Sequence, residues 1–316
     1  MNLLITGGCG FIGSNFVELV LTEMRDAVNK VVNLDALTYA GTTENTQEFD
    51  EDEKYVFEKV DICNLGEVHR VCNQHDITHI VHLAAESHVD NSILNPRAFI
   101  DTNVLGTYNL LQVAKQNGLR FHHVSTDEVY GELGETGKFN ENTAYDPRNP
   151  YSASKASSDF LVMAYYHTYG LEVTISNCSN NYGPRQHQEK FIPTVISCIL
   201  NGKKIPLYGT GTNIRDWIYV KDHCIGIWDV LTSGIIGETY CIGSNCEKRN
   251  IDIIHTICST MGVTPEESIE YVEDRLGHDF RYAIDSAKIT ENLFWQPQTS
   301  FEDGIEMTIR WYNEKN

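Results

Sequence analysis

The stretch Gly7-Gly8-Cys9-Gly10-Phe11-Ile12-Gly13, directly after the apolar run Asn2–Thr6, decides the fold of this chain. The preceding run is predicted to be a β-strand, and Gly13–Met24 has apolar side chains at the three- and four-residue spacing of a helix. Glycines at 7, 10 and 13 permit a tight turn, a close approach of backbone to a pyrophosphate, and packing of the helix on the strand. This context predicts a dinucleotide-binding fold, with Gly7, Gly10, Phe11, Ile12 and Gly13 beside the ligand at the helix N-terminus.

Asp35 follows Gly13 by roughly 20 residues, the spacing expected of the ribose-binding acid in such folds, and it comes directly after the predicted strand Lys30–Leu34. A carboxylate there can bind both hydroxyls of an adenosine ribose and would repel a 2′-phosphate, which favours NAD over NADP. We also expect Asp61-Ile62 and Leu83-Ala84-Ala85, at the ends of two further predicted strands, to lie beside the cofactor. Asp61 would serve equally as the cap of the following helix, and paired alanines are common in ordinary packing.

The rest of the chain divides into two patterns. Through the first half, short β-branched runs alternate with helical patterns, which predicts an α/β fold with a doubly wound parallel sheet covered by helices on both faces. After residue 178, short strands and helices mix with loops rich in Gly, Asn and Arg. We therefore expect a Rossmann domain over 1–178, also taking in part of 216–243, and a smaller α/β substrate domain over 179–316. The remaining predicted strands are Tyr55–Val60, His79–Leu83, Arg120–Ser125, Glu172–Asn177, Ile205–Tyr208, Thr239–Ile242 and Ile269–Val272, and the remaining predicted helices are Ala98–Gln116, Ser152–Tyr169, Ile192–Leu200, Val220–Leu231, Ile251–Met261 and Phe301–Tyr312.

Composition argues against two classes of partner. The formal net charge is −20, whereas nucleic-acid and anionic-membrane surfaces require concentrated positive charge. No apolar run approaches the ~20 residues that cross a bilayer, and the strand pattern begins too soon after Met1 to leave room for a signal peptide. Nine cysteines without a CxxC pair are typical of reduced thiols, so we expect a cytoplasmic protein without a metal site.

Tyr151 and Lys155 stand four residues apart, which puts both side chains on one face of a helix. A lysine ammonium beside a phenol favours the phenolate, so the pair predicts a tyrosine pKa lowered toward the working pH. This spacing is common on ordinary helices and becomes informative because the glycine fingerprint precedes it. Thr126, beside the end of the strand Arg120–Ser125, supplies the expected hydroxyl partner. The combination indicates NAD-dependent oxidation of an alcohol, as in short-chain dehydrogenases.

Asp127-Glu128 comes directly after Thr126, at the carboxyl end of that strand, where doubly wound folds bind their ligands. Successive side chains of a strand point oppositely, so both carboxyls can face one substrate only if the chain bends, and Val129-Tyr130-Gly131 would supply the bend. Two carboxyls in opposite protonation states can remove a proton and protonate a leaving hydroxyl. The pair therefore predicts elimination of water after the oxidation.

Seven segments together resemble the nucleotide-sugar 4,6-dehydratases of the extended short-chain dehydrogenase/reductase family, over nearly the whole chain. Thr-Asp-Glu is much more specific in this setting than the glycine fingerprint or the Tyr/Lys pair. The segments are Leu-Ala-Ala-Glu-Ser-His-Val-Asp (83–90), Thr-Asp-Glu-Val-Tyr-Gly (126–131), Pro-Tyr-Ser-Ala-Ser-Lys-Ala-Ser-Ser-Asp (150–159), Asn-Cys-Ser-Asn-Asn-Tyr-Gly-Pro (177–184), Glu-Lys-Phe-Ile-Pro (189–193), Ile-Arg-Asp-Trp (214–217) and Asp-Arg-Leu-Gly-His-Asp-Phe-Arg-Tyr (274–282).

The resemblance, nearest to the members that act on dTDP-glucose, implies formation of a 4-keto-6-deoxy sugar. Tyr151, assisted by Lys155 and Thr126, would take the C4 hydroxyl proton as hydride passes to NAD⁺. Glu128 would remove the C5 proton, and Asp127 would protonate the departing C6 hydroxyl. Return of the hydride to C6 would regenerate NAD, so the enzyme would be a lyase without net redox change.

The resemblance also assigns residues to the nucleotide sugar. Lys190, Arg215 and Arg275 are candidate diphosphate contacts, where an arginine fork matches phosphate oxygens. Solvated surface arginines are the usual case, and the asparagines at 177–181 are equally compatible with turn chemistry. The other candidate contacts are Glu86, Ser87 and Tyr282 at the sugar, Pro206 and Tyr208 near the base, and Asn177, Asn180, Glu189, Asn250 and His278 as further contacts.

Several alternatives stay open at this level. UDP-glucose or UDP-N-acetylglucosamine would fit the same residues, because dTDP and UDP differ only by a base methyl and a ribose hydroxyl. A nucleotide-sugar epimerase would share the glycines, Tyr151 and Lys155 but would not need Asp127 and Glu128. A catalytically silent NAD-binding protein would not need the complete catalytic set. The resemblance implies a homodimer through the helices containing Leu105–Val113 and Tyr151–Tyr166, which would serve equally as sheet-covering helices.

Overall fold

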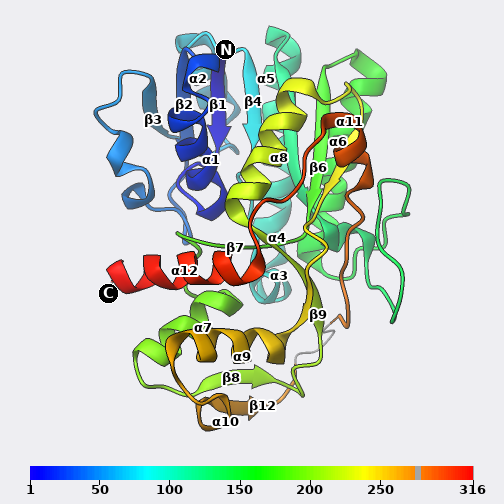
Figure 1. Ribbon diagram of the computed structural model, residues 1–316. Coiled ribbons are helices and arrows are strands. Elements are labelled where there is room, and N and C mark those ends of the chain that lie inside the picture. The colour runs from blue at the N-terminus through cyan, green and yellow to red at the C-terminus, as the bar shows by residue number, and fades with distance from the viewer. Residues whose placement is uncertain (275–278, 316) are drawn as a thin grey trace.

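The computed structural model describes residues 1–274 and 279–315, and a seven-stranded parallel sheet forms its centre (Figure 1). The strand order across the sheet is β10-β6-β5-β4-β1-β2-β3, and all strands are parallel. The chain adds strands on one side of β1 and then, from β4 on, on its other side, which confirms the predicted doubly wound arrangement. A crevice opens at such a change of side, at the carboxyl ends of the strands. The strands are β1 (Asn2–Thr6), β2 (Lys30–Asp35), β3 (Tyr55–Lys59), β4 (His79–His82), β5 (Arg120–Thr126), β6 (Val173–Cys178) and β10 (Thr239–Ile242).

Helices cover both faces of this sheet, so the residues of its strands are buried on both sides. On one face, α1 and α8 pack against each other and bury side chains such as Phe16 and Ile227. On the other face, α2, α5 and α6 bury side chains such as Val71, Leu110 and Val162. These helices are α1 (Phe11–Thr22), α8 (Val220–Ser233), α2 (Leu65–Gln74), α5 (Thr107–Asn117) and α6 (Pro150–Tyr169).

A second, smaller assembly lies beyond the carboxyl edge of the sheet, in the lower part of Figure 1. It contains a three-stranded sheet, β11-β9-β7, and a parallel pair, β12-β8. Its own core packs Ile196, Ile254 and Ile305 from three helices. The elements are β7 (Asn180–Tyr182), β8 (Ile205–Tyr208), β9 (Ile214–Tyr219), β11 (Glu247–Arg249), β12 (Ile269–Val272), α7 (Phe191–Leu200), α9 (Asn250–Met261) and α12 (Phe301–Lys315).

The predicted helix Ala98–Gln116 differs from the structure in its interior. Its backbone passes from α4 (Pro96–Phe99) through a π-helical segment, η4 (Ile100–Gly106), into α5. Such segments often occur at functional sites. Here η4 contains Asn103, whose amide bonds both the N–H and the carbonyl of Glu86. The remaining elements are η1 (Arg25–Ala27), η2 (Thr43–Asn45), η3 (Gln47–Phe49), α3 (Val89–Leu94), η5 (Asp127–Tyr130), α10 (Pro265–Ser268) and α11 (Ala287–Leu293).

Three strands, β7, β9 and β11, escaped prediction. β7 and β11 have only three residues each, and β9 carries the charged pair Arg215-Asp216 inside an apolar stretch. Long-range pairing with one another stabilises them, which no local pattern reports. Within residues 1–274 and 279–315, no helix has the length and apolar character needed to span a membrane.

Candidate active site

Two adjoining cavities open at the carboxyl edge of the large sheet. The first, of ≈ 340 Å³, lies over β1, β2, β4 and β5. The second, of ≈ 410 Å³, lies between the large sheet and the smaller assembly. Six residues contribute to the walls of both, so the cavities meet along a shared boundary: Glu128, Asn180, Asn181, Gln186, Glu189 and Lys190.

The glycine loop forms one wall of the first cavity and fits a dinucleotide. Gly7 has φ +74°, and a Cβ there would lie 2.7 Å from the backbone of Ala84. At Gly13 a Cβ would lie 2.1 Å from the Gly7 carbonyl oxygen, so the loop and α1 touch backbone to backbone. α1 begins after Gly10 without a side-chain cap, which leaves its first amides available to a phosphate.

Asp35 lies at the far end of this wall, where β2 ends. Its two carboxylate oxygens accept hydrogen bonds from the amides of Cys9 (2.9 Å) and Leu37 (2.8 Å). These bonds fix the carboxylate between the glycine loop and the segment Thr38–Gly41, which sequence reasoning did not assign and which also lines the cavity. The carboxylate therefore stands where the ribose of a dinucleotide would reach the end of the second strand.

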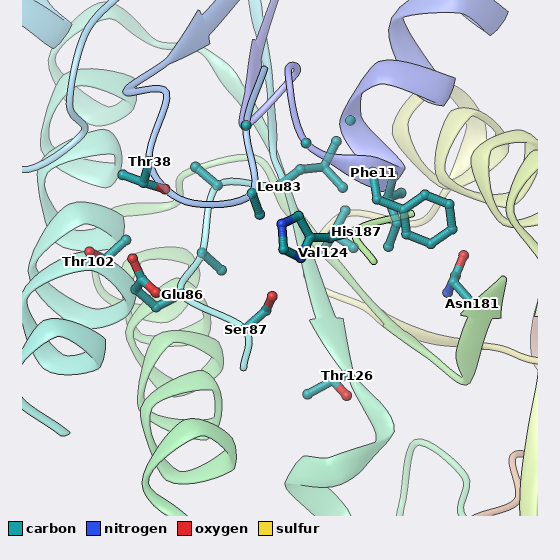
Figure 2. A pocket seen from close by; sticks show the side chains of 18 of the residues that line it. Phe11, Thr38, Leu83, Glu86, Ser87, Thr102, Val124, Thr126, Asn181 and His187 are labelled. Carbon is teal, nitrogen blue, oxygen red and sulfur yellow. The ribbon is translucent and has the colours of Figure 1, made fainter. Parts of the chain in front are cut away.

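The other predicted cofactor residues line the same cavity. Asp61, Ile62, Leu83, Ala84 and Ala85 all contribute to its walls, and so do Glu86 and Ser87, which had been expected at the sugar. Figure 2 shows Glu86, Ser87 and Thr102 lining the cavity together with Phe11 and with Val124 and Thr126 of β5. His187 also lines it (Figure 2). Nothing in its polar sequence neighbourhood signalled this role, because His187 reaches the cavity from the second half of the chain.

The two adjacent carboxyls occupy the turn after β5. Residues Asp127–Tyr130 form the 3₁₀ turn η5, Thr126 caps it by accepting a hydrogen bond from the Glu128 amide, and Gly131 ends it with φ +87°. This turn is the bend that the sequence predicted, and it brings both carboxyls to the first cavity. Glu128 also lines the second cavity.

The surroundings of Asp127 and Glu128 separate their acidities. Burial holds the pKa of Asp127 well above its usual value, and the carboxylates of Glu128 and Asp216 raise it further. Burial also raises the pKa of Glu128, but the positive charges of Lys190 and Arg215 oppose that rise. Two carboxyls whose environments push their pKa values apart are suited to act as an acid and a base. In this pair, Asp127 is placed to hold a proton and Glu128 to accept one.

Tyr151 and Lys155 project from the first turns of α6, and both line the first cavity together with the two carboxyls. The predicted lowering of the tyrosine pKa is wrong for this arrangement. Burial, followed by the Glu128 carboxylate, holds the pKa of Tyr151 well above its usual value. Lys155, one helical turn along the same face, donates its ammonium to the Val124 carbonyl (2.9 Å). A hydrogen bond with Thr126 opposes the rise.

The second cavity collects most of the predicted nucleotide-sugar residues. The Arg215 guanidinium lies 4.4 Å from the centre of the Tyr282 ring and donates to the carbonyl of Asp279 (3.0 Å). Lys190 crosses the shared boundary, where its ammonium donates to the Ser87 carbonyl (3.2 Å). The predicted residues that line this cavity are Asn180, Glu189, Lys190, Pro206, Tyr208, Arg215, Asn250 and Tyr282.

Five predicted residues are not in this set, of which Glu86 and Ser87 line the first cavity. Asn177 is fully buried behind the site, where its amide donates to the Thr126 carbonyl (3.0 Å), and it lines neither cavity. Its position in the middle of a buried parallel sheet directs it toward β5. Arg275 and His278 lie outside the described residues.

Sequence reasoning missed other residues of the second cavity. Asn149 caps α6 by accepting from the Ser152 amide (2.8 Å), and its side chain also hydrogen-bonds Glu128. Asp90, Arg148 and Asp279 add charge to the walls. The Asn-Pro pair before Tyr151 was a detectable helix-start signal, but nothing local placed the other three at the site.

Comparison with known proteins identifies the family of this chain. The sequence matches the family described as GDP-mannose 4,6 dehydratase over residues 4–308. It is 50% identical to dTDP-glucose 4,6-dehydratase 1 of Escherichia coli K12, over 99% of this chain and 92% of that protein. The chain belongs to the nucleotide-sugar 4,6-dehydratase family. Another member, the dTDP-glucose 4,6-dehydratase of Neisseria meningitidis serogroup B, is 48% identical over 98% of this chain and 92% of its own.

Solved structures place this 4,6-dehydratase family member in the extended short-chain dehydrogenase/reductase fold. The dTDP-glucose 4,6-dehydratase DesIV of Streptomyces venezuelae, solved with NAD and dTDP, superposes with a TM-score of 0.96 at 46% identity, covering 99% of this chain and 97% of that one. UDP-glucose 4-epimerase of Thermotoga maritima also superposes, with a TM-score of 0.92 at 26% identity, covering 100% and 99% of the two chains. Because the backbone fold is common to dehydratases and epimerases, the side chains at the site must distinguish them.

Proposed function

We propose that the protein is an NAD-dependent hydro-lyase that converts dTDP-glucose to its 4-keto-6-deoxy product. The observation that carries this proposal is the turn Asp127–Tyr130, which presents two carboxyls of separated acidity beside Tyr151. Oxidation alone would not need that pair, whereas elimination of water requires both an acid and a base. The identity to dTDP-glucose 4,6-dehydratases over nearly the whole chain supports the same reaction.

The residues around the shared boundary divide the proton transfers. Tyr151, hydrogen-bonded to Thr126, takes the proton of the C4 hydroxyl. Glu128, between the positive charges of Lys190 and Arg215, removes the C5 proton. Asp127, protonated because it is buried beside other carboxylates, delivers its proton to the C6 hydroxyl, which leaves as water. When bound, NAD⁺ accepts the C4 hydride and returns it to C6, and its ring charge favours the Tyr151 phenolate.

The two cavities divide the binding. Residues 1–178, with the segment around α8 and β10, hold NAD through Gly7, Gly10, Gly13 and Asp35. Residues 179–316 supply most of the nucleotide-sugar cavity, in which Lys190 and Arg215 bind the diphosphate. Glu86 and Ser87 lie near the C4–C6 edge of the sugar, since they line the cofactor cavity with Tyr151.

Glu128→Gln tests the reaction. We expect transient absorbance of reduced cofactor at 340 nm with loss of the 4-keto-6-deoxy product, because oxidation at C4 survives and removal of the C5 proton does not. Glu135→Gln, on an exposed loop residue, is the matched control and should turn over normally. Full dehydration by Glu128→Gln would contradict the assigned base and favour an epimerase-like use of the fold.

The identity of the nucleotide in the substrate needs a separate measurement. We expect kcat/KM to be highest for dTDP-glucose when it is compared with UDP-glucose and UDP-N-acetylglucosamine under the same conditions. A base methyl contributes only about 10- to 200-fold discrimination in an apolar pocket, so UDP-glucose should be a measurable but poorer substrate. A higher kcat/KM for either UDP sugar would replace the dTDP assignment and leave the reaction class intact.

We also propose a cytoplasmic homodimer built through α5 and α6. These two helices pack together and carry the exposed apolar side chains Tyr108 (38% exposed) and Phe160 (63%), and Leu105 (44%) of η4 directly precedes α5. A neighbouring copy would bury them, and nine free cysteines fit a reducing compartment. Phe160→Glu should sediment as a monomer, whereas Ile235→Glu, at an exposed apolar residue elsewhere, should remain a dimer. Monomeric wild-type protein at micromolar concentration would contradict the assembly.

A further inference from the structure

A buried polar cluster extends inward from Ser125 and Lys155, which line the first cavity beside Tyr151. It joins His123 and Ser125 of β5, Lys155 and Asp159 of α6, and Tyr145 of the preceding loop. Lys155 and Asp159 stand one helical turn apart, so both face the same strand. Neither His123 nor Asp159 lines either of the two cavities described above, and their side chains are 0% and 2% exposed.

Asp159 is held firmly by its neighbours. One carboxylate oxygen accepts hydrogen bonds from the Ser125 hydroxyl (2.8 Å), the Tyr145 hydroxyl (2.9 Å) and the Asn177 amide (3.5 Å). The other lies 3.2 Å from His123 Nε2. Burying a carboxylate is costly unless it is hydrogen-bonded or paired with a cation. The number of donors therefore indicates that this position is built for a charged group.

The cation is Lys155, which approaches the same edge of the His123 ring as Asp159. Burial holds the pKa of His123 well below its usual value, so the ring is neutral and the two charges act on each other across it. Lys155 Nζ lies 3.4 Å from the same ring nitrogen, His123 Nε2, and donates its firmest bond to the Val124 carbonyl (2.9 Å). Burial lowers the pKa of Lys155, and the charge of Asp159 is the largest influence opposing that fall. Lysine, histidine and aspartate thus form a continuous line leading inward from the catalytic tyrosine.

The other titratable groups near this line are neutral. Burial holds the pKa of His82, whose ring lies 5.1 Å from that of His123, well below its usual value. Burial raises the pKa of Tyr130 and Tyr145 above the usual range. Cys178 would favour the Lys155 ammonium only as a thiolate, and burial raises its pKa to about 12. Asp159 is therefore the group that supplies negative charge to Lys155 near neutral pH.

We propose that Asp159 is a positioning residue for the oxidation step: its negative charge, acting across the His123 ring, balances the charge of the Lys155 ammonium and holds Lys155 behind Tyr151. This inference rests on the proposed dehydratase function. Asp159 does not touch the sugar or the cofactor. It acts by keeping Lys155 charged, and that charge favours the Tyr151 phenolate that accepts the C4 hydroxyl proton.

The consequence for pH follows from the charge of Asp159. Burial raises its pKa to about 6, so the carboxylate is charged above this pH and neutral below it. Oxidation by the wild-type enzyme should therefore weaken as the pH falls through about 6. Asp159→Asn removes the charge at every pH, so Lys155 loses its proton more readily and Tyr151 needs a higher pH to ionise.

The test is the pH profile of the oxidation step, measured as single-turnover absorbance of reduced cofactor with dTDP-glucose. For Asp159→Asn we expect a rate about tenfold lower at pH 7 and an acid limb shifted to higher pH by about one unit, the tenfold equivalent of one pKa unit. NAD content and KM should stay within about twofold, because neither cavity contains Asp159. Ser157→Ala, on the exposed side of the same helix, is the matched control and should leave the profile unchanged.

A second variant covers the case in which Asp159→Asn does not fold. Ser125→Ala with Tyr145→Phe removes two donors from Asp159 but keeps its charge, which raises the carboxyl pKa and moves the acid limb upward by a smaller amount. An acid limb that stays at the wild-type position in both variants would overturn the inference. Wild-type protein that forms no 4-keto-6-deoxy product would instead overturn the proposed function, so the two failures are distinguishable.

Discussion

The two cavities differ in what forms their walls. The cofactor cavity is made largely by backbone at the ends of consecutive parallel strands, with Gly7 against Ala84 and Gly13 against the Gly7 carbonyl. The substrate cavity is made by side chains from segments far apart in the chain, from His88 to Tyr282. Parallel strands bring their carboxyl ends to one edge automatically. No such rule brings together a helix start, a strand interior and a loop.

This difference predicts two kinds of failure. A change in the cofactor cavity collides with backbone that cannot move aside, so it should damage folding and NAD binding together. A change in the substrate cavity removes one contact among several and should weaken substrate binding while the fold and NAD remain. At the turn that carries Asp127 and Glu128, a change that relieves unfavourable burial should raise the stability of the fold and lower activity, because active sites retain such burial for function.

The largest effect is expected for Gly13→Ala. The added Cβ would lie 2.1 Å from the Gly7 carbonyl oxygen and 2.8 Å from its carbonyl carbon, and overpacking of this kind costs about 3 kcal/mol. We expect the purified variant to contain less than a tenth of the wild-type NAD and to unfold at lower urea. Gly66→Ala is the control, because its Cβ would meet nothing nearer than 3.6 Å. Full NAD content in Gly13→Ala would contradict the backbone-built cavity.

Arg215→Lys should affect only the substrate cavity. The guanidinium lies over the Tyr282 ring and bonds the Asp279 carbonyl, and an ammonium cannot reproduce this flat, forked arrangement. We expect KM for dTDP-glucose to rise about 10- to 100-fold, equivalent to about 1.4–3 kcal/mol, with unchanged NAD content. Arg249→Lys, in an exposed ion pair with Asp252, should leave KM as in the wild type. Loss of NAD from Arg215→Lys would mean that the cavities are not separable.

Asp127→Asn should stabilise the protein while preventing dehydration. Burial raises the folded-state pKa of this carboxyl well above its ordinary value of 3.8, so the unfolded chain releases the proton first and folding stability falls as the pH rises above that value. The amide removes this penalty. We expect the free energy of unfolding to exceed that of the wild type by about 1–3 kcal/mol at pH 7, with a smaller difference at pH 4, in urea titrations. A variant less stable than the wild type at pH 7 would refute a protonated Asp127.

The smallest effect is expected for Arg185→Ala, which cuts a link between the two regions. Arg185 follows β7 and binds Glu18 on α1 (2.5 Å) and Glu48 (2.9 Å), both of which are largely exposed. Stability should fall by less than about 1 kcal/mol. The loop that carries His187 over the cofactor cavity should loosen, so we expect NAD to dissociate severalfold faster in a chase experiment. Lys221→Ala, which breaks the exposed pair with Glu23, should not change that rate.

Local sequence was sufficient for the large sheet. Every predicted strand of its first half lies within one or two residues of the observed one, because buried parallel strands are continuous β-branched runs. The short strands β7 and β9 could not be predicted from the sequence, because they pair with each other across more than thirty residues of chain. The π-helical segment within the predicted helix Ala98–Gln116 could not be predicted either, because it occurs together with hydrogen bonds between Asn103 and Glu86, which are distant in sequence.

By itself, the sequence determined the dinucleotide fold, the turn that presents Asp127 and Glu128, and the family, because each depends on residues adjacent in the chain. Only the tertiary structure decided how those residues titrate. Tyr151 has a raised and not a lowered pKa, because it is buried beside the Glu128 carboxylate. Asn177 turns out to lie behind the site and His187 in it. Burial and electrostatic environment are set by neighbours distant in sequence, so no local pattern encodes them.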